Sequence, residues 1–181
     1  MKKYIASIIL LAALGGLFAQ TGLFDISYED PWPHADSLLA KFGYLAENIE
    51  GPMVKYYSKQ DPMVEAVILF INPDNLKVAG WFVKHRNTLS SEMDQIVVDR
   101  VYDMHGESTH YDRATEQLIW VLSPKRSIHL LYVSDGSLCV LYSDSDYEDL
   151  FIVDKTKLTE DNPQPVEANP QVPKQPIPTP E

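Results

Sequence analysis

Three short apolar runs in residues 118–143 constrain the fold more than any other part of the chain. The sequence SPKR at 123–126 separates the first run from the second, and SDGS at 134–137 separates the second from the third. The Asp-Gly pair tolerates the positive φ angles of a tight turn, which predicts a hairpin with a two-residue loop. Because the runs are rich in Leu, Val, Ile and Tyr and are too short for long helices, they predict a three-stranded antiparallel meander.

The same order of signals occurs earlier in the chain, which predicts an internal duplication. In each half a glycine that can end a helix, Gly43 or Gly106, precedes an extended segment, an apolar run, a turn and a second apolar run. These glycines are 63 residues apart, and the later pair Val78 and Val140 is 62 apart. A nearly constant spacing is typical of repeats. We therefore expect an α+β fold of two tandem α-β-β-β units, with two short helices packed on one face of an antiparallel sheet.

Periodicity predicts the two helices and a leading strand. Residues 23–28 alternate in hydrophobicity, which predicts a strand at the front of the sheet. A first helix is expected to be capped by Asp30 and to include Phe42 on its buried side. A second helix is expected to be capped by Ser90 or Ser91. The expected buried stripe of this second helix consists of Met93, Ile96, Val97, Val101 and Met104.

The N-terminus has the pattern of a secretory signal peptide. Lys2 and Lys3 precede an apolar stretch at 5–17, and Ala19 is a small residue suited to cleavage after it. The stretch is short for a bilayer span. The one cysteine, Cys139, is far from the cleavage site, so the sequence predicts neither a lipid anchor at an N-terminal cysteine nor an intramolecular disulfide. We expect a periplasmic or extracellular protein that is not a lipoprotein and has no membrane span.

Composition divides the chain into a signal peptide, one folded domain and a tail. Residues 159–181 hold seven of the 13 prolines and almost no large apolar residue, so this Pro-rich tail is expected to be disordered. Between the signal peptide (1–19) and the tail, residues 20–158 are enough for a single α+β domain. Within that domain the internal repeats are expected at about 33–86 and 90–143.

No motif in the sequence indicates a particular reaction or cofactor. His105 and His110 flank the sequence GEST, with Asp103 and Asp112 nearby, and such side chains can bind zinc. Their spacing fits neither the metalloprotease pair nor a common structural zinc site, so no metal, cofactor or catalytic residue is predicted. Removing the two lysines of the signal peptide changes the formal net charge from −11 to −13. Such an acidic chain argues against nucleic acid as a partner.

The hairpin of the meander predicts apolar side chains on both faces of the sheet. With a two-residue loop, His129 and Leu131 share one face with Val140, whereas Leu130 shares the other with Cys139. Two helices cover only one face, so the other must meet a partner, another copy, the first strand and tail, or a ligand. Large aromatic side chains dominate interface energetics. The expected binding residues are therefore Tyr57, Trp81, Trp120, Tyr132 and Tyr142.

Two segments give the chain a resemblance to known folds. LLAKFG at 38–43 with its following strands, and residues 96–106 followed by Trp120 and SIHL at 127–130, resemble the tandem helix–three-strand repeats of the beta-lactamase-inhibitor-protein-like and BamE-like (SmpA/OmlA) folds. In such proteins helices pack on one side of an antiparallel sheet, and the open, concave side can bind protein. The resemblance implies a binding role by analogy. The chain lacks the lipoprotein cysteine of BamE-like proteins and the disulfides of the secreted inhibitor, so neither specific function is carried over.

The sequence leaves three functional hypotheses. The first is an exported, non-enzymatic binding module that holds a protein or peptide on an open sheet face. The second is a small envelope hydrolase or metal-dependent enzyme with His105, His110, Asp103 or Asp112 at its site. The third is a self-associating structural envelope protein whose open face is closed in a homodimer.

Overall fold

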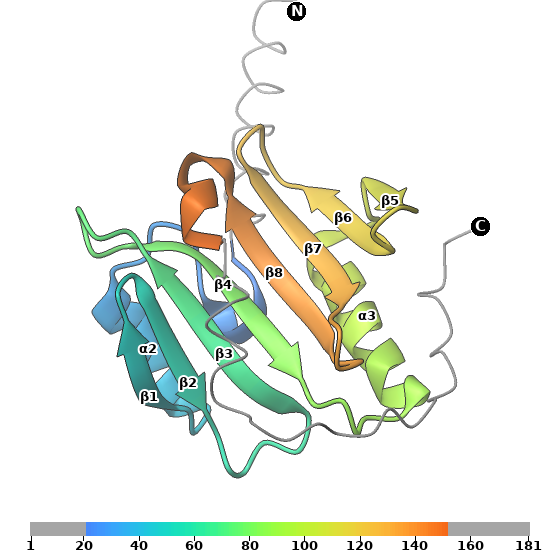
Figure 1. Ribbon diagram of the computed structural model, residues 1–181, viewed down its shortest axis with the longest axis horizontal. Helices are drawn as coiled ribbons and strands as arrows, with labels where there is room; N and C mark the ends of the chain where they lie inside the picture. Colours follow the sequence, from blue (N-terminus) through green and yellow to red (C-terminus); the bar gives the residue numbers. More distant parts are fainter. Residues whose placement is uncertain (1–20, 152–181) are drawn as a thin grey trace, which may run out of the picture.

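The computed structural model describes residues 21–151, so the expected signal peptide at 1–19 and the expected tail at 159–181 lie outside the described residues. The fold is α+β, as predicted, with one antiparallel sheet of eight strands and the two α-helices behind it in Figure 1. The first half contains α2 (Trp32–Lys41), β1 (Leu45–Glu50), β2 (Met53–Tyr57), β3 (Val64–Ile71) and β4 (Val78–His85). The second half contains α3 (Ser91–His105), β5 (His110–Asp112), β6 (Gln117–Val121), β7 (Arg126–Tyr132) and β8 (Leu138–Asp144). Two 3-10 helices, η1 (Leu23–Asp25) and η2 (Ser145–Phe151), are the first and the last elements of the described residues.

The sheet order β1-β2-β3-β4-β8-β7-β6-β5 gives the two halves the same arrangement. Each half is a helix followed by a four-stranded meander, and β4 and β8 pair antiparallel at the centre. The prediction of three strands per unit is therefore wrong, because each helix is followed by an additional edge strand, β1 or β5. These strands, LAENIE and HYD, lack a continuous apolar run and are held by backbone pairing with β2 and β6. A common origin of the two halves stays a prediction.

The strand predicted at 23–28 is not formed, and η1 and a turn replace it. Phe24 and Asp25 have φ angles of 65° and 60°, which an extended strand cannot accommodate. Ile26 and Tyr28 are nevertheless buried, with 0% and 4% exposure. The alternation therefore identified residues that point into the core, but the backbone between them follows a tight turn.

Helix α2 begins at Trp32 without a side-chain cap. The expected cap, Asp30, is engaged elsewhere, because its carboxylate accepts a hydrogen bond from the backbone N–H of Ser27 (3.0 Å). Phe42 is 50% exposed rather than buried, because the helix ends one residue earlier, at Lys41. The residues that bury the helix against the sheet are Ala35, Leu38 and Leu39.

Helix α3 has the predicted cap but a different buried face. The Ser90 side chain accepts a backbone hydrogen bond from the first turn of the helix (3.4 Å). The expected stripe is partly wrong: Val97 and Val101 are buried, whereas Met93, Ile96 and Met104 are 44%, 58% and 37% exposed. Asp94 points inward instead, where its carboxylate accepts a hydrogen bond from the hydroxyl of Tyr132 on β7 (3.0 Å). Asp94 therefore shares the buried face of the helix with Val97 and Val101, and Met93 lies outside that face.

The loop between β7 and β8 contains three residues rather than the predicted two. The backbone N–H of Val133 donates to the carbonyl oxygen of Ser137 (3.0 Å), which closes the loop. The additional residue shifts the pairing, so that Tyr132 lies opposite Leu138 instead of Cys139. A shift of one residue moves every side chain of a strand to the other face. The predicted division of the meander residues between the two faces is therefore wrong.

The helices cover a sheet face whose side chains form the core. Trp81 on β4 and Tyr142 on β8 pair across the centre, and their rings stack with centroids 4.1 Å apart. The indole Nε1 of Trp120 donates to the carbonyl oxygen of Gly106 at the end of α3 (2.8 Å). The row of paired residues that crosses this face, each at most 2% exposed, consists of Leu69, Trp81, Tyr142, Ile128 and Trp120.

Candidate functional site

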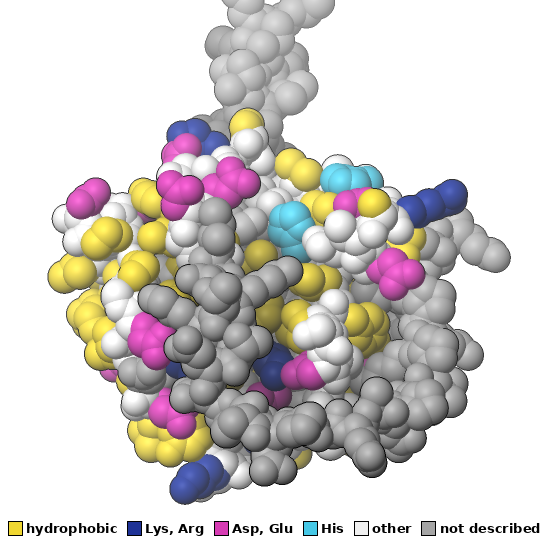
Figure 2. Space-filling model, viewed as in Figure 1, with side chains coloured by type: hydrophobic (Ala, Val, Ile, Leu, Met, Phe, Trp, Pro, Cys, Tyr) yellow, Lys and Arg dark blue, Asp and Glu magenta, His cyan; other side chains and the backbone are white. Residues whose placement is uncertain are grey.

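The sheet face opposite α2 and α3, which we call the open face, is the candidate site. Directly paired residues point to the same side of a sheet, and the register defines a row that crosses this face from β2 to β5. The row consists of Lys55, Ile68, Phe82, Leu141, His129, Ile119 and His110. The two end residues are exposed, and the five between them are half-buried. Figure 2 views this face and shows apolar side chains on it, with histidines toward β5 and β6.

A charged cluster lies on the open face near the end of β4. Lys84 Nζ is 2.7 Å from a carboxylate oxygen of Asp135 and 3.1 Å from one of Glu65. Burial lowers the pKa of Lys84, but the hydrogen bonds to the two carboxylates outweigh this effect and raise it. Burial would raise the pKa of Asp135, but its hydrogen bonds with Lys84 and Ser137 lower it to about 2. Two carboxylates thus share one ammonium group, which leaves an excess negative charge in this cluster.

A chain of hydrogen bonds crosses the open face from β6 to β8. His129 Nδ1 lies 3.0 Å from Gln117 Oε1, and His129 Nε2 lies 2.8 Å from the Ser127 hydroxyl. The Ser127 hydroxyl is also 3.0 Å from that of Ser143. The amide oxygen accepts the Nδ1 proton, so Nε2 accepts the hydrogen bond that Ser127 donates. Burial, together with the nearby His110, lowers the pKa of His129, so the imidazole is neutral at neutral pH.

This order of serine, base and amide matches that of a nucleophilic hydrolase, but the strand backbone provides no oxyanion hole. The N–H groups of β7 lie in the plane of the sheet and face β6 and β8, so none of them points at a group bound above Ser127. In residues 21–151, no group of three or more His, Cys, Asp and Glu side chains could hold a metal ion. The chain of hydrogen bonds is therefore better suited to binding a polar group than to catalysis.

The last described residue, Phe151, lies on the open face. Its ring meets that of Phe70 nearly edge to face, with centroids 4.7 Å apart. It also covers Gly80, where an added Cβ would be 2.8 Å from the Phe151 ring. The missing side chain of Gly80 thus makes room for the aromatic ring on the sheet. As a result, the chain leaves the described part of the structure over the open face.

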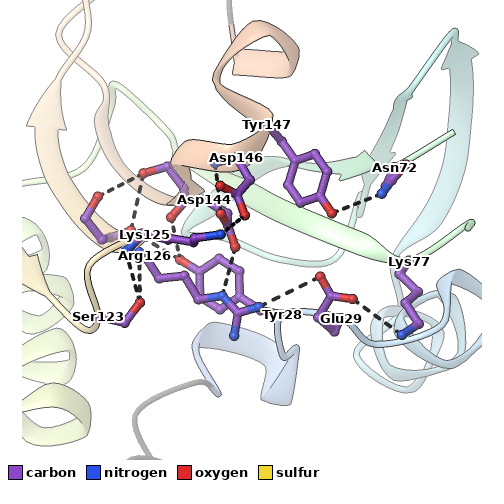
Figure 3. A network of polar contacts seen from close by, with 12 residues as sticks. Tyr28, Glu29, Asn72, Lys77, Ser123, Lys125, Arg126, Asp144, Asp146 and Tyr147 are labelled. Carbon is purple, nitrogen blue, oxygen red and sulfur yellow. Dashed lines mark hydrogen bonds and ion pairs between the residues drawn. The ribbon is translucent and has the colours of Figure 1, made fainter. Parts of the chain in front are cut away.

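An ion pair joins β7, β8 and the N-terminal segment beside η2 (Figure 3). Arg126 Nε is 2.9 Å from Asp144 Oδ2, and the side chains are 16% and 4% exposed. The guanidinium carbon lies 4.7 Å from the centroid of the Tyr28 ring, and Arg126 Nη2 is 3.8 Å from a carboxylate oxygen of Glu29. The Tyr28 hydroxyl donates to the carbonyl oxygen of Ser127 (3.2 Å). These contacts fix the end of β8, from which η2 begins.

Two further contacts hold η2 itself (Figure 3). The Asn72 side-chain amide, on the loop after β3, donates to the Tyr147 hydroxyl (3.1 Å). Lys125 forms an exposed ion pair with Asp146. Because η2 is attached both to the β6–β7 loop and to the loop after β3, Phe151 is held over the central strands.

Only one of the five expected aromatic binding residues lies on the open face. Tyr57 is half-buried on β2 and points to the open side. Trp81, Trp120 and Tyr142 are in the core beneath the helices, and Tyr132 also lies on the covered face, bonded to a carboxylate of α3. These four residues are corrected from binding to structural positions, because large side chains are needed to fill the space between the sheet and the helices.

The open face is made largely of residues that sequence reasoning did not single out. Its aliphatic and aromatic members alternate with core residues along β3, β4, β7 and β8. Each of these strands carries apolar residues on both sides, so the sequence pattern does not show which side faces the helices. The i, i+2 spacing of Ser127 and His129 was the one available signal for the chain of hydrogen bonds. That signal becomes useful only when the register is known, because Gln117 and Ser143 come from neighbouring strands.

The two histidines considered as metal ligands lie on opposite faces of the sheet. Nε2 of His105 is 3.3 Å from the hydroxyl of Tyr142 on the covered face, whereas His110 belongs to the row on the open face. Asp103 is exposed on the outside of α3. The Asp112 carboxylate accepts hydrogen bonds from donors two and three residues further along its own turn. These four side chains therefore do not converge on one site.

Protonation of buried histidines is expected to make the fold less stable in mild acid. Burial lowers the pKa of His85, His105 and His129 below the usual value of 6.5, so the unfolded chain binds more protons than the folded one. Their stabilising contribution is present above pH 6.5 and is lost as the pH falls through the folded values. Urea unfolding between about pH 8 and 5.5 measures this loss. His105→Gln should reduce it; a variant that loses as much stability over this pH range as the wild type would contradict the prediction.

Comparison of the chain with family models, with curated proteins and with solved structures found no match. Among the helices of residues 21–151, none is long and apolar enough to cross a membrane. The functional argument therefore depends on the geometry and chemistry of the open face.

Proposed function

We propose that this protein is an exported, non-enzymatic binding module that holds a protein or peptide segment on its open face. The observation that carries the proposal is the half-buried apolar row through Ile68, Phe82 and Leu141, on a face opposite both α-helices. Contiguous apolar surface of this kind is typical of interaction sites. A regular sheet is also a rigid support, which lowers the entropic cost of binding. The signal-peptide pattern at 1–19 supports export.

The groups around the row indicate what kind of segment would bind. A segment in which apolar and polar residues alternate would pack its apolar side chains on Phe82 and Leu141. Gln117, whose amide oxygen accepts the Nδ1 proton of His129, would donate a hydrogen bond from its amide NH2 group to a polar group of the segment. A basic residue of the segment would be attracted to the cluster that contains Glu65 and Asp135. The ligand class is therefore an extended, partly apolar segment with at least one basic side chain.

Two other arguments favour binding over the alternatives. In the beta-lactamase-inhibitor-protein-like and BamE-like folds, which the chain resembles, the open side of a helix-backed sheet can bind protein, and we extend only this general mode to the present chain. A hydrolase is less well supported, because the sheet backbone offers no oxyanion-binding group at Ser127. The homodimeric structural protein is tested by the same experiment.

Replacing Leu131 with lysine is expected to weaken peptide binding by about tenfold or more, because it introduces a charge next to the apolar row. Leu131 is half-buried on β7 and pairs with Cys139 on the open face. The probe is a peptide selected from a random display library on the chain that begins at Gln20, and fluorescence anisotropy gives its Kd. The matched control, Ile96→Lys, changes a 58% exposed residue on α3 and should bind like the wild type.

The proposal is wrong if the library yields no binding peptide, or if the two lysine variants bind the selected peptide equally well. Light scattering on the same proteins tests self-association. A wild-type dimer that Leu131→Lys converts to a monomer would also contradict the proposal and favour the structural alternative.

A further inference from the structure

We propose that residues 152–158 of this chain lie across the open face and cover it when no ligand is bound. The described chain ends at Phe151, whose ring is already seated on Phe70 and over Gly80 of this face. The contacts of η2 with the loops before β4 and β7 hold that ring in place. The residues that follow Phe151 are therefore attached directly to the open face, with no linker between them and it.

The sequence after Phe151, IVDKTKL, fits the surface that lies ahead of it. Its first two residues are apolar and would continue the contact of Phe151 onto Phe82, where β4 crosses the apolar row. From Gly80 to Lys84, β4 covers four residues, or about 13 Å at about 3.3 Å per residue. Four extended residues span the same length, so Lys155 would arrive beside Lys84.

The charged cluster at that point suits an arriving lysine. Asp135 and Glu65 both contact Lys84, at 2.7 Å and 3.1 Å, so two carboxylates are neutralised by a single ammonium group. A second cation would balance the cluster, and Lys155 is the first basic residue after Phe151. Lys157 is two residues further, on the same side of an extended chain. The length, the apolar residues and the charge of residues 152–158 thus all fit this segment to the open face.

The consequence is competition between the chain's own segment and an external ligand. Only this consequence rests on the proposed function, because the docking itself requires no ligand. A segment attached directly to the site acts at an effective concentration in the millimolar range, so weak contacts are enough for high occupancy. An external segment would then bind only if its own contacts are better than those of residues 152–158.

Cys139 provides a direct test in the full chain that begins at Gln20. It lies on the open face, paired with Lys84, and it is buried, which raises its pKa to about 12. The probe is N-ethylmaleimide, and the measured quantity is the alkylation rate of this single cysteine at a fixed pH. The double variant Ile152→Ser/Val153→Ser is expected to react at least about threefold faster, because the local opening that exposes the thiol becomes more frequent. Lys155→Glu should also accelerate the reaction.

The matched control is Val166→Ser/Val172→Ser, which makes the same kind of change further along the tail and should react like the wild type. Equal rates in the wild type and in both variants of residues 152–155 would overturn the inference. If the variants of residues 152–155 react faster but the library yields no binding peptide, only the proposed function is contradicted. Peptide binding that is unchanged in the Ile152→Ser/Val153→Ser variant, with unchanged alkylation, would contradict the docking alone.

Discussion

Replacing Trp81 with alanine is expected to lower the free energy of unfolding by about 3–5 kcal/mol, a large part of the stability of a small domain. The side chain is fully buried, and its ring stacks on Tyr142 at 4.1 Å and packs against Tyr28 at 5.0 Å. Because β4 and β8 join the two halves of the sheet at this point, the strands cannot move together to fill the cavity. Urea unfolding followed by circular dichroism measures the effect.

The matched control for this substitution is Tyr57→Ala. Both aromatic residues are candidates for binding by sequence, but Tyr57 is only half-buried at the end of β2, so its loss should cost roughly 1 kcal/mol or less. Trp81→Phe should restore much of the stability, because the indole Nε1 has no hydrogen-bond partner among the described residues. A loss of stability that is the same for Trp81→Ala and Tyr57→Ala would contradict the assignment of Trp81 to the core.

Replacing Arg126 with methionine is expected to destabilise the protein by about 3 kcal/mol, because it leaves a buried carboxylate without its cation. Asp144 is 3% exposed, and its Oδ2 lies 2.9 Å from Arg126 Nε. The same substitution removes the guanidinium group from the Tyr28 ring. Since Asp144 precedes η2 directly, amide hydrogen exchange in η2 should also become faster.

The neighbouring lysine is a close control for this substitution. Lys125 pairs with Asp146 in the same network, but both side chains are at least half exposed, so Lys125→Met should leave the stability unchanged within experimental error. If Arg126→Met and Lys125→Met have the same effect on unfolding and on exchange in η2, then the ion pair of Arg126 does not hold this end of the sheet.

The sequence was sufficient for the parts of the fold that depend on local chemistry. Short β-branched and aromatic runs separated by turn residues predicted an antiparallel sheet, and Ser90 predicted the start of α3. The sequence did not predict features in which a residue adopts a locally unfavourable backbone conformation or environment. Phe24 and Asp25 adopt positive φ angles in a segment that alternates like a strand, and Asp94 is buried because Tyr132 on a distant strand binds it.

The candidate site shows the same division. Two helices and a sheet with two apolar faces imply that one face is left open, and this much follows from the sequence. Which residues lie on that face depends on a single loop residue between β7 and β8, because one position of register moves Cys139 and Leu131 from opposite faces to the same face. Of the five aromatic residues expected there, only Tyr57 is on the open side, because packing against the helices requires large rings.

The sequence by itself determined the α+β class, the helix and the last three strands of each half, and the existence of an uncovered apolar face, because hydrophobic periodicity and turn chemistry are local properties. The tertiary structure alone decided which face is covered, where Phe151 is seated and which side chains Lys84 and His129 contact. Those features depend on register and on contacts between residues far apart in the chain, and neither is encoded in any single segment.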